Sequence, residues 1–151
     1  MLALAVAFLL AASPLKGFAP RVPRVIAAPE LSYPQMARMA RIQGTVTVKV
    51  QLTDEGLVAS AEVVMTTINT RQSQAGILSN AALENVQKWK FEPLNPQAPS
   101  RRSFEVRYVF KLVGQPAGYS SRMRVRHPLT VEITSHPPVP GGDLSEVRDK
   151  E

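Results

Sequence analysis

The stretch GTVTVKVQLTDEGLVASAEVV, residues 44–64, decides the fold because it predicts a β-hairpin. Every second residue from Val46 to Leu52 is apolar, so one face of the first strand is apolar and the other is polar. Asp54 and Gly56 favour a tight turn between the two strands. The return strand is expected to place four residues on the apolar face: Leu57, Ala59, Ala61 and Val63. A hairpin is only marginally stable alone, so the rest of the chain must supply a third strand and a cover.

The cover is predicted to follow an irregular polar loop over residues 65–76. Four apolar residues recur there at helical spacing: Leu78, Ala82, Val86 and Trp89. Ser79 or Asn80 is expected to cap this helix, which must end before Pro93. Trp89 could form a ligand platform, but its place on the apolar face favours core packing.

A shorter helix is predicted before the hairpin. Ser32-Tyr33-Pro34 is typical of a helix start, with Ser at the cap and Pro in the first turn. An apolar stripe is expected to face inward, formed by Met36, Ala37, Met39 and Ala40. Arg38 and Arg41 are then expected to face solvent.

Residues 103–112 predict the third strand, because apolar residues from Phe104 to Leu112 alternate with mostly polar ones. Two more short strands are expected in the extension 114–135, where apolar and polar residues alternate on either side of His127-Pro128. These strands could add to the sheet or cover its edge. Several arginines could bind an acidic partner, although a solvated surface is the favoured interpretation: Arg101, Arg102, Arg122, Arg124 and Arg126.

Composition bounds the function. The chain has 151 residues, a formal charge of +6 and no cysteine, so disulfides and thiol chemistry are excluded. The basic residues are scattered and no aromatic and glycine-containing RNA-binding motif occurs, so we expect no nucleic-acid partner. His127 and His136 have no second ligand at metal-binding spacing, and no nucleophile–base or phosphate-binding motif occurs. We therefore expect no enzyme activity, no catalytic or metal site, and no cofactor.

The two ends of the chain carry other signals. Leu2 to Ala12 is an apolar run too short to span a bilayer, so residues 1–19 are interpreted as a signal peptide or a short anchor. A buried core helix is the alternative interpretation of this run. Residues 20–30 are expected to form a proline-rich extended linker, and residues 136–151 a disordered tail.

Motifs spaced along residues 31–113 occur in a fixed order: Tyr33-Pro34, Ala37-Arg38, Ile42, Gly44–Val48, Asp54–Val58, Ala81–Leu83, Trp89–Pro93 and Phe104–Leu112. Together they resemble the C-terminal domain of TonB, the energy transducer of Gram-negative outer-membrane transport. The resemblance implies an α+β fold with a three-stranded antiparallel sheet and two helices packed on one face, to which the extension could add a strand or hairpin.

The resemblance also implies a function. In the family, a segment of an outer-membrane transporter adds as a strand beside the last strand, a contact known as β-augmentation. Carried over by position, the partner-binding residues are Ser103, Phe104, Glu105, Arg107, Val109 and Lys111. The expected protein is a periplasmic protein-interaction module, which would contact the inner membrane only through an uncut N-terminus. The alternative is a structural scaffold or homodimer, whose sheet edge is closed by residues 123–133 or by a second copy.

Overall fold

The computed structural model describes residues 20–97, 100–127 and 129–141, and the fold is α+β as expected. The predicted signal peptide or anchor, residues 1–19, lies outside these residues. The elements in chain order are β1 (Val25–Ala27), α1 (Gln35–Met39), β2 (Gly44–Leu52), β3 (Val58–Ile68), a 3-10 turn (Gln72–Gln74), α2 (Ala75–Val86), β4 (Lys90–Phe91), β5 (Ser103–Leu112), β6 (Ser121–Arg126) and β7 (Thr130–Ser135).

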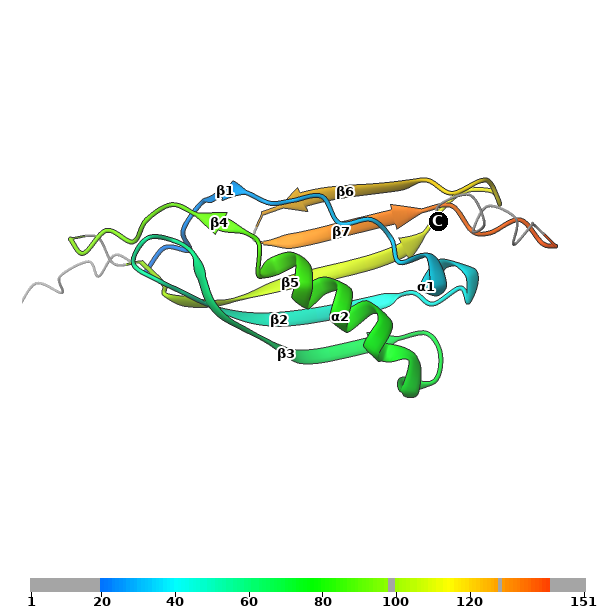
Figure 1. Ribbon diagram of the computed structural model, residues 1–151, viewed down its shortest axis with the longest axis horizontal. Coiled ribbons are helices and arrows are strands. Elements are labelled where there is room, and N and C mark those ends of the chain that lie inside the picture. Colours follow the sequence, from blue (N-terminus) through cyan, green and yellow to red (C-terminus); the bar gives the residue numbers. More distant parts are fainter. Residues whose placement is uncertain (1–19, 98–99, 128, 142–151) are drawn as a thin grey trace, which may run out of the picture.

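The main sheet has five strands in the order β3-β2-β5-β7-β6 (Figure 1). The antiparallel unit β3-β2-β5 is the predicted three-stranded sheet. The sequence left open whether the extension adds to this sheet or covers its edge, and in the structure it adds two strands. β7 pairs in parallel with β5, and β6 pairs antiparallel with β7. We call β6 and β7 the C-terminal hairpin.

Two β-bulges change which side chains of β3 face inward. Leu52 pairs with Val58 and Gln51 with Ser60, so Ala59 is an extra residue that shifts the alternation by one. Leu57 is therefore 47% exposed instead of buried as predicted, and Val58 packs against the core. A second extra residue, Val64, is followed by continued pairing, so β3 runs to Ile68 where an irregular loop was expected.

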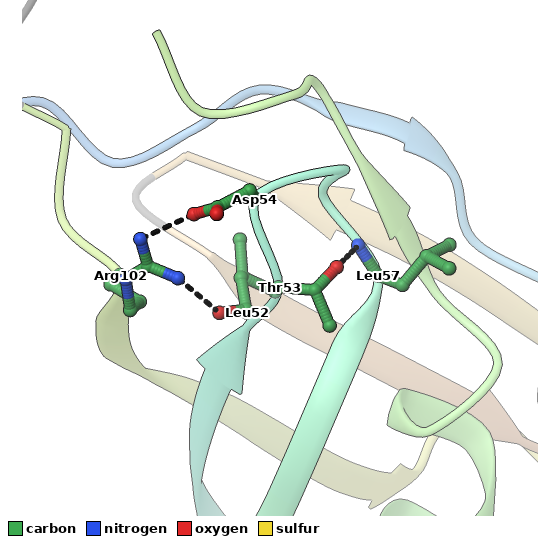
Figure 2. Close-up of polar contacts among 5 residues, drawn as sticks. All are labelled: Leu52, Thr53, Asp54, Leu57 and Arg102. Carbon is green, nitrogen blue, oxygen red and sulfur yellow. Dashed lines mark hydrogen bonds and ion pairs between the residues drawn. The ribbon is translucent and has the colours of Figure 1, made fainter. Parts of the chain in front are cut away.

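The turn between β2 and β3 is held by side chains (Figure 2). The Leu57 amide donates to Thr53 Oγ1 at 3.2 Å, which closes the turn. Arg102, just before β5, forms an ion pair with Asp54 and donates from Nη1 to the Leu52 carbonyl at 3.4 Å. Arg102 thus joins the hairpin turn to the start of the third strand. Asp54 stabilises the turn through its ion pair with Arg102.

Helix α2 crosses one face of the sheet and closes the core (Figure 1). All four residues predicted on its apolar face are fully or almost fully buried: Leu78, Ala82, Val86 and Trp89. The expected cap was wrong, because the helix begins at Ala75 and follows directly on the 3-10 turn. Trp89 lies in the turn after the helix and is 1% exposed, which confirms core packing.

A buried polar cluster ties α2 to the sheet and to the N-terminal segment, residues 20–34. Asn85 Oδ1 accepts hydrogen bonds from Trp89 Nε1 at 2.8 Å and from the Tyr108 hydroxyl at 2.9 Å. Asn85 Nδ2 donates to the Pro29 carbonyl at 2.8 Å. Val25 also pairs with Phe91 in the small sheet formed by β1 and β4. The N-terminal segment is therefore packed on the domain, whereas an exposed linker was expected for residues 20–30.

Helix α1 presents a different face to the core than its sequence indicates. Ala37 is buried as predicted, but Met36 is 72% exposed. Arg38, expected in solvent, is 5% exposed. The helix has only five residues and lies at one end of the sheet, where the carbonyl groups of the extension face it. Those carbonyls give an arginine better partners than a methionine could have.

Candidate partner-binding edges of the sheet

The predicted partner-binding residues lie on β5, in the middle of the five-stranded sheet. Phe104 points into the core and is 7% exposed. The other five lie on the face that the helices leave uncovered, where three are exposed and two are half-buried: Ser103, Glu105, Arg107, Val109 and Lys111. The structure therefore places these side chains together on one sheet face.

Both sides of β5 carry neighbouring strands. β2 pairs with it over residues 103–110, and β7 pairs with it over residues 107–112. Among the described residues, only 103–106 of β5 have no strand on the β7 side. The position at which the family's partner strand adds is thus held along most of its length by the chain's own extension. That β5 residues bind a partner stays a prediction.

The C-terminal hairpin is built into the core. Val131 and Ile133 on β7 are fully buried within the same apolar cluster as the first three strands. Backbone hydrogen bonds continue beyond the paired residues, from the Arg107 amide to the Leu129 carbonyl at 3.0 Å and from the Val113 amide to the Ser135 carbonyl at 2.8 Å. Displacing β7 would therefore expose apolar surface as well as break a strand ladder.

Arg38 fastens the segments that flank the hairpin to α1. Its Nε donates to the His136 carbonyl at 2.8 Å, and Nη2 donates to the Ala117 carbonyl. Its guanidinium lies over the Tyr119 ring at 5.6 Å from the centroid. The Tyr119 hydroxyl in turn donates to the Tyr33 carbonyl at 2.8 Å. Residue 136, predicted to start a disordered tail, is instead held in place.

The sequence analysis did not identify the structural roles of Asn85 and Arg38. Asn85 is a polar residue on the apolar face of α2, four positions before Trp89, and this spacing was a usable signal. Arg38 carried a weaker signal, because it belongs to a motif of the resemblance but sits between apolar neighbours in a short helix. Its partners are backbone carbonyls far along the chain, which no local pattern indicates.

The outer strands of the sheet are β3 and β6 (Figure 1). The β3 edge is partly covered, since Gln72 Nε2 donates to the Thr66 carbonyl at 3.2 Å and the Thr66 hydroxyl contacts that of Ser79 at 2.8 Å. The N-terminal segment contacts β6 through side chains, with the Tyr33 amide donating to Ser121 Oγ at 2.6 Å. In the described part of the chain, no strand pairs with the outer side of either β3 or β6.

Cations gather on the uncovered face next to the β6 edge. The register sets Arg122 opposite Thr134, Arg124 opposite Glu132, and Arg126 opposite Thr130. The two threonines of β7 also pair with cations on their other side, because Thr134 is opposite Lys111 of β5 and Thr130 is opposite Arg107. We call this group the basic patch: Arg107, Lys111, Arg122, Arg124 and Arg126, with Glu132 among them. Its five cations and one carboxylate give a formal charge of +4.

Other kinds of site are not visible in the described part of the chain. Residues 20–97, 100–127 and 129–141 contain no group of three or more His, Cys, Asp or Glu side chains able to hold a metal. None of the helices in this part is long and apolar enough to cross a membrane.

An open depression on the uncovered face is lined partly by Thr47, Glu105, Arg107 and Thr130, next to the basic patch.

Comparison with known proteins gives one family. The family model described as the Gram-negative bacterial TonB protein C-terminal matches residues 29–112, more than half of the chain. The match covers α1 through β5 and stops before the C-terminal hairpin. No curated protein matches the chain.

Proposed function

Because the chain belongs to the family of Gram-negative bacterial TonB protein C-terminal domains, we propose that it is a periplasmic interaction domain that binds an extended segment of another envelope protein by strand addition. Domains of this family are non-enzymatic and interact with outer-membrane transporters, so a transporter segment is the first partner class to test. The observation that carries the proposal is the sheet itself, which ends in two strands without a described outer neighbour.

Two routes lead to strand addition. In the first, the segment takes the family's position beside β5, at residues 103–111, and displaces the C-terminal hairpin. That route exposes Val131 and Ile133, which costs on the order of 1.5–3 kcal/mol each. The combined cost lowers the binding affinity by a factor of roughly 10² to 10⁴. In the second, the segment pairs with an outer strand and the hairpin stays in place. The second route therefore needs less binding energy from the partner.

The test is a titration of the isotope-labelled full chain with a short synthetic peptide of high strand propensity, followed by amide chemical shifts. Strand addition predicts shifts that follow one strand, either β3, β5 or β6. The β5 route additionally predicts the loss of hydrogen-exchange protection in β7. Shifts confined to α1 and α2, or no shifts with any peptide, would contradict the proposal.

A structural role is the second candidate, and the docked hairpin is the observation that favours it. The extension closes the β5 edge along residues 107–112, as the scaffold hypothesis requires. This role predicts that the intact chain binds no strand-forming peptide. It also predicts that deleting residues 119–151 changes the oligomeric state in analytical ultracentrifugation, because the β5 edge becomes free. Unchanged ultracentrifugation together with peptide binding by the intact chain would rule it out.

A further inference from the structure

The C-terminal hairpin places a new strand at the margin of the sheet, and we propose that the outer edge of β6 binds an acidic extended segment of a partner protein. The inference rests on the proposed function, and it names the accepting strand and the chemistry of the segment. It uses the arginines of β6, which neither the core nor the family match accounts for.

The edge of β6 is available to a new strand. β6 pairs with β7 along all six of its residues, and among the described residues no strand pairs with its other side. The N-terminal segment contacts the side chains of Ser121 and Met123, which alternate with the arginines and therefore belong to the opposite face. An outer strand of this kind offers its backbone N–H and C=O groups to an extended peptide.

The arginines of β6 repeat with the period of a strand. Arg122, Arg124 and Arg126 lie on one face and are all exposed. Alternate residues of a strand are about 6.8 Å apart, so an added strand with carboxylates at alternate positions presents them at the same spacing. A guanidinium binds a carboxylate through two parallel N–H donors, which makes arginine well suited to this contact.

Among the described residues, these arginines have few acidic partners. Arg126 Nε contacts Glu132 Oε2 at 3.4 Å, and the same Glu132 is the residue opposite Arg124. Arg122 lies opposite a threonine, Thr134. On its other side, Thr134 pairs with Lys111 of β5, so this position adds a further cation and no carboxylate. Like charges on neighbouring positions repel each other, so an added row of carboxylates would relieve this repulsion.

The positive charge is a strip and does not extend over the whole face. On the other side of β5, Lys49 pairs with both Glu62 and Glu105, so that part of the face is slightly acidic. A flat anionic membrane would contact both regions, whereas one extended segment along β6 contacts only the basic patch. The distribution of charge therefore favours an acidic peptide segment over a lipid surface.

The experiment titrates the labelled full chain with a synthetic peptide that has glutamate at alternate positions between valines and threonines. We expect amide shifts in residues 121–126 and an affinity that falls with added NaCl. A peptide with glutamine in place of every glutamate should bind about tenfold more weakly. The triple variant Arg122→Gln/Arg124→Gln/Arg126→Gln should show a similar loss for the acidic peptide.

A matched control removes three cations elsewhere. Arg71, Lys88 and Lys90 are exposed and lie outside the main sheet, so Arg71→Gln/Lys88→Gln/Lys90→Gln changes the net charge equally. This variant should bind the acidic peptide within about twofold of the parent chain, because none of the three charges lies on β6 and salt screens exposed charges. An equal loss in both triple variants would overturn the inference, because binding would then follow net charge and not position.

Three other results overturn the inference in different ways. Shifts along β3 or β5 would keep the proposed function but place the acceptor strand elsewhere. Binding of phosphatidylglycerol vesicles that depends on the β6 arginines, without binding of the acidic peptide, would assign the patch to a lipid surface. No binding of any peptide, acidic or neutral, would remove the proposed function together with the inference.

Discussion

The family-matched part of the chain and the C-terminal hairpin share one core but are held in different ways. The matched part, residues 29–112, is held by antiparallel strand pairing, by the helix cover and by the buried hydrogen bonds of the Asn85 cluster. The hairpin is joined by a parallel ladder to β5 and by contacts from Arg38 and Tyr33 to segments far along the chain. A strand edge at the end of the family-matched part can therefore be closed by residues that lie outside the match.

The strongest test of this comparison is whether the hairpin contributes to the core as much as the matched part does. Ile133 on β7 and Ile42 before β2 are both fully buried. Replacing a buried isoleucine by alanine costs about 2–5 kcal/mol. We expect Ile133→Ala and Ile42→Ala to lower the free energy of unfolding by amounts in this range, measured by urea denaturation.

A cooperative domain predicts one transition for both variants. If Ile133→Ala costs less than about 1 kcal/mol while Ile42→Ala costs the full amount, the hairpin is an appendage that is easily released. The route to strand addition through β5 would then need little more binding energy from the partner than the route through an outer strand. Two separate transitions in Ile133→Ala would lead to the same conclusion.

Much of the matched part could be predicted from sequence because its signals are local. Alternation from Val46 to Leu52 and in β5, and the helical spacing of Leu78 to Trp89, each depend on neighbours within a few residues. The bulges at Ala59 and Val64 were missed because a one-residue insertion is set by pairing with β2, which alternation alone does not specify. The two strands of the hairpin were also indicated by alternation. Their place beside β5 is a long-range pairing, so it was left open.

The candidate site was predictable only in part for the same reason. The sequence indicated that Arg122, Arg124 and Arg126 share a face, but it could not show that β6 is an outer strand. The transfer of partner-binding residues to β5 assumed a sheet that ends there. Arg38 was assigned to solvent because its partners are backbone carbonyls at residues 117 and 136, which carry no side-chain signature.

A second prediction concerns the attachment of the hairpin to α1. Arg38→Met keeps a long side chain but leaves the Ala117 and His136 carbonyls without their donor, which we expect to cost about 1–3 kcal/mol. Amide hydrogen exchange should speed up most in β6 and β7. The control is Arg102→Met, whose exposed ion pair with Asp54 should contribute less than about 1 kcal/mol. Uniform acceleration across all strands in Arg38→Met would show that Arg38 does not act on the hairpin in particular.

The smallest expected effect comes from Tyr108, which lies where the two parts meet. It pairs with Val131 on β7, and its hydroxyl donates to Asn85 inside the matched part. Burial raises the pKa of Tyr108 well above the usual value of about 10. Between the two pKa values the folded protein keeps a proton that the unfolded chain has lost, so the free energy of unfolding falls as the pH rises above about 10. The slope is about 1.4 kcal/mol per pH unit for each such group.

Burial also raises the pKa of Tyr33. The free energy of unfolding of Tyr108→Phe should therefore fall at alkaline pH by about half as much as that of the parent chain, because Tyr33 still contributes. The measurement compares urea denaturation of the parent chain and of Tyr108→Phe at pH 8 and at pH 11. The variant should be less stable than the parent at pH 8 by about 1 kcal/mol, because it lacks one buried hydrogen bond. The difference should vanish or reverse at pH 11, and groups that both proteins share cancel in the comparison. If the free energy of unfolding falls equally in the two proteins between pH 8 and pH 11, Tyr108 becomes hydrated without unfolding of the domain. The junction between the hairpin and the matched part would then open locally, and β5 would again be open to a partner strand.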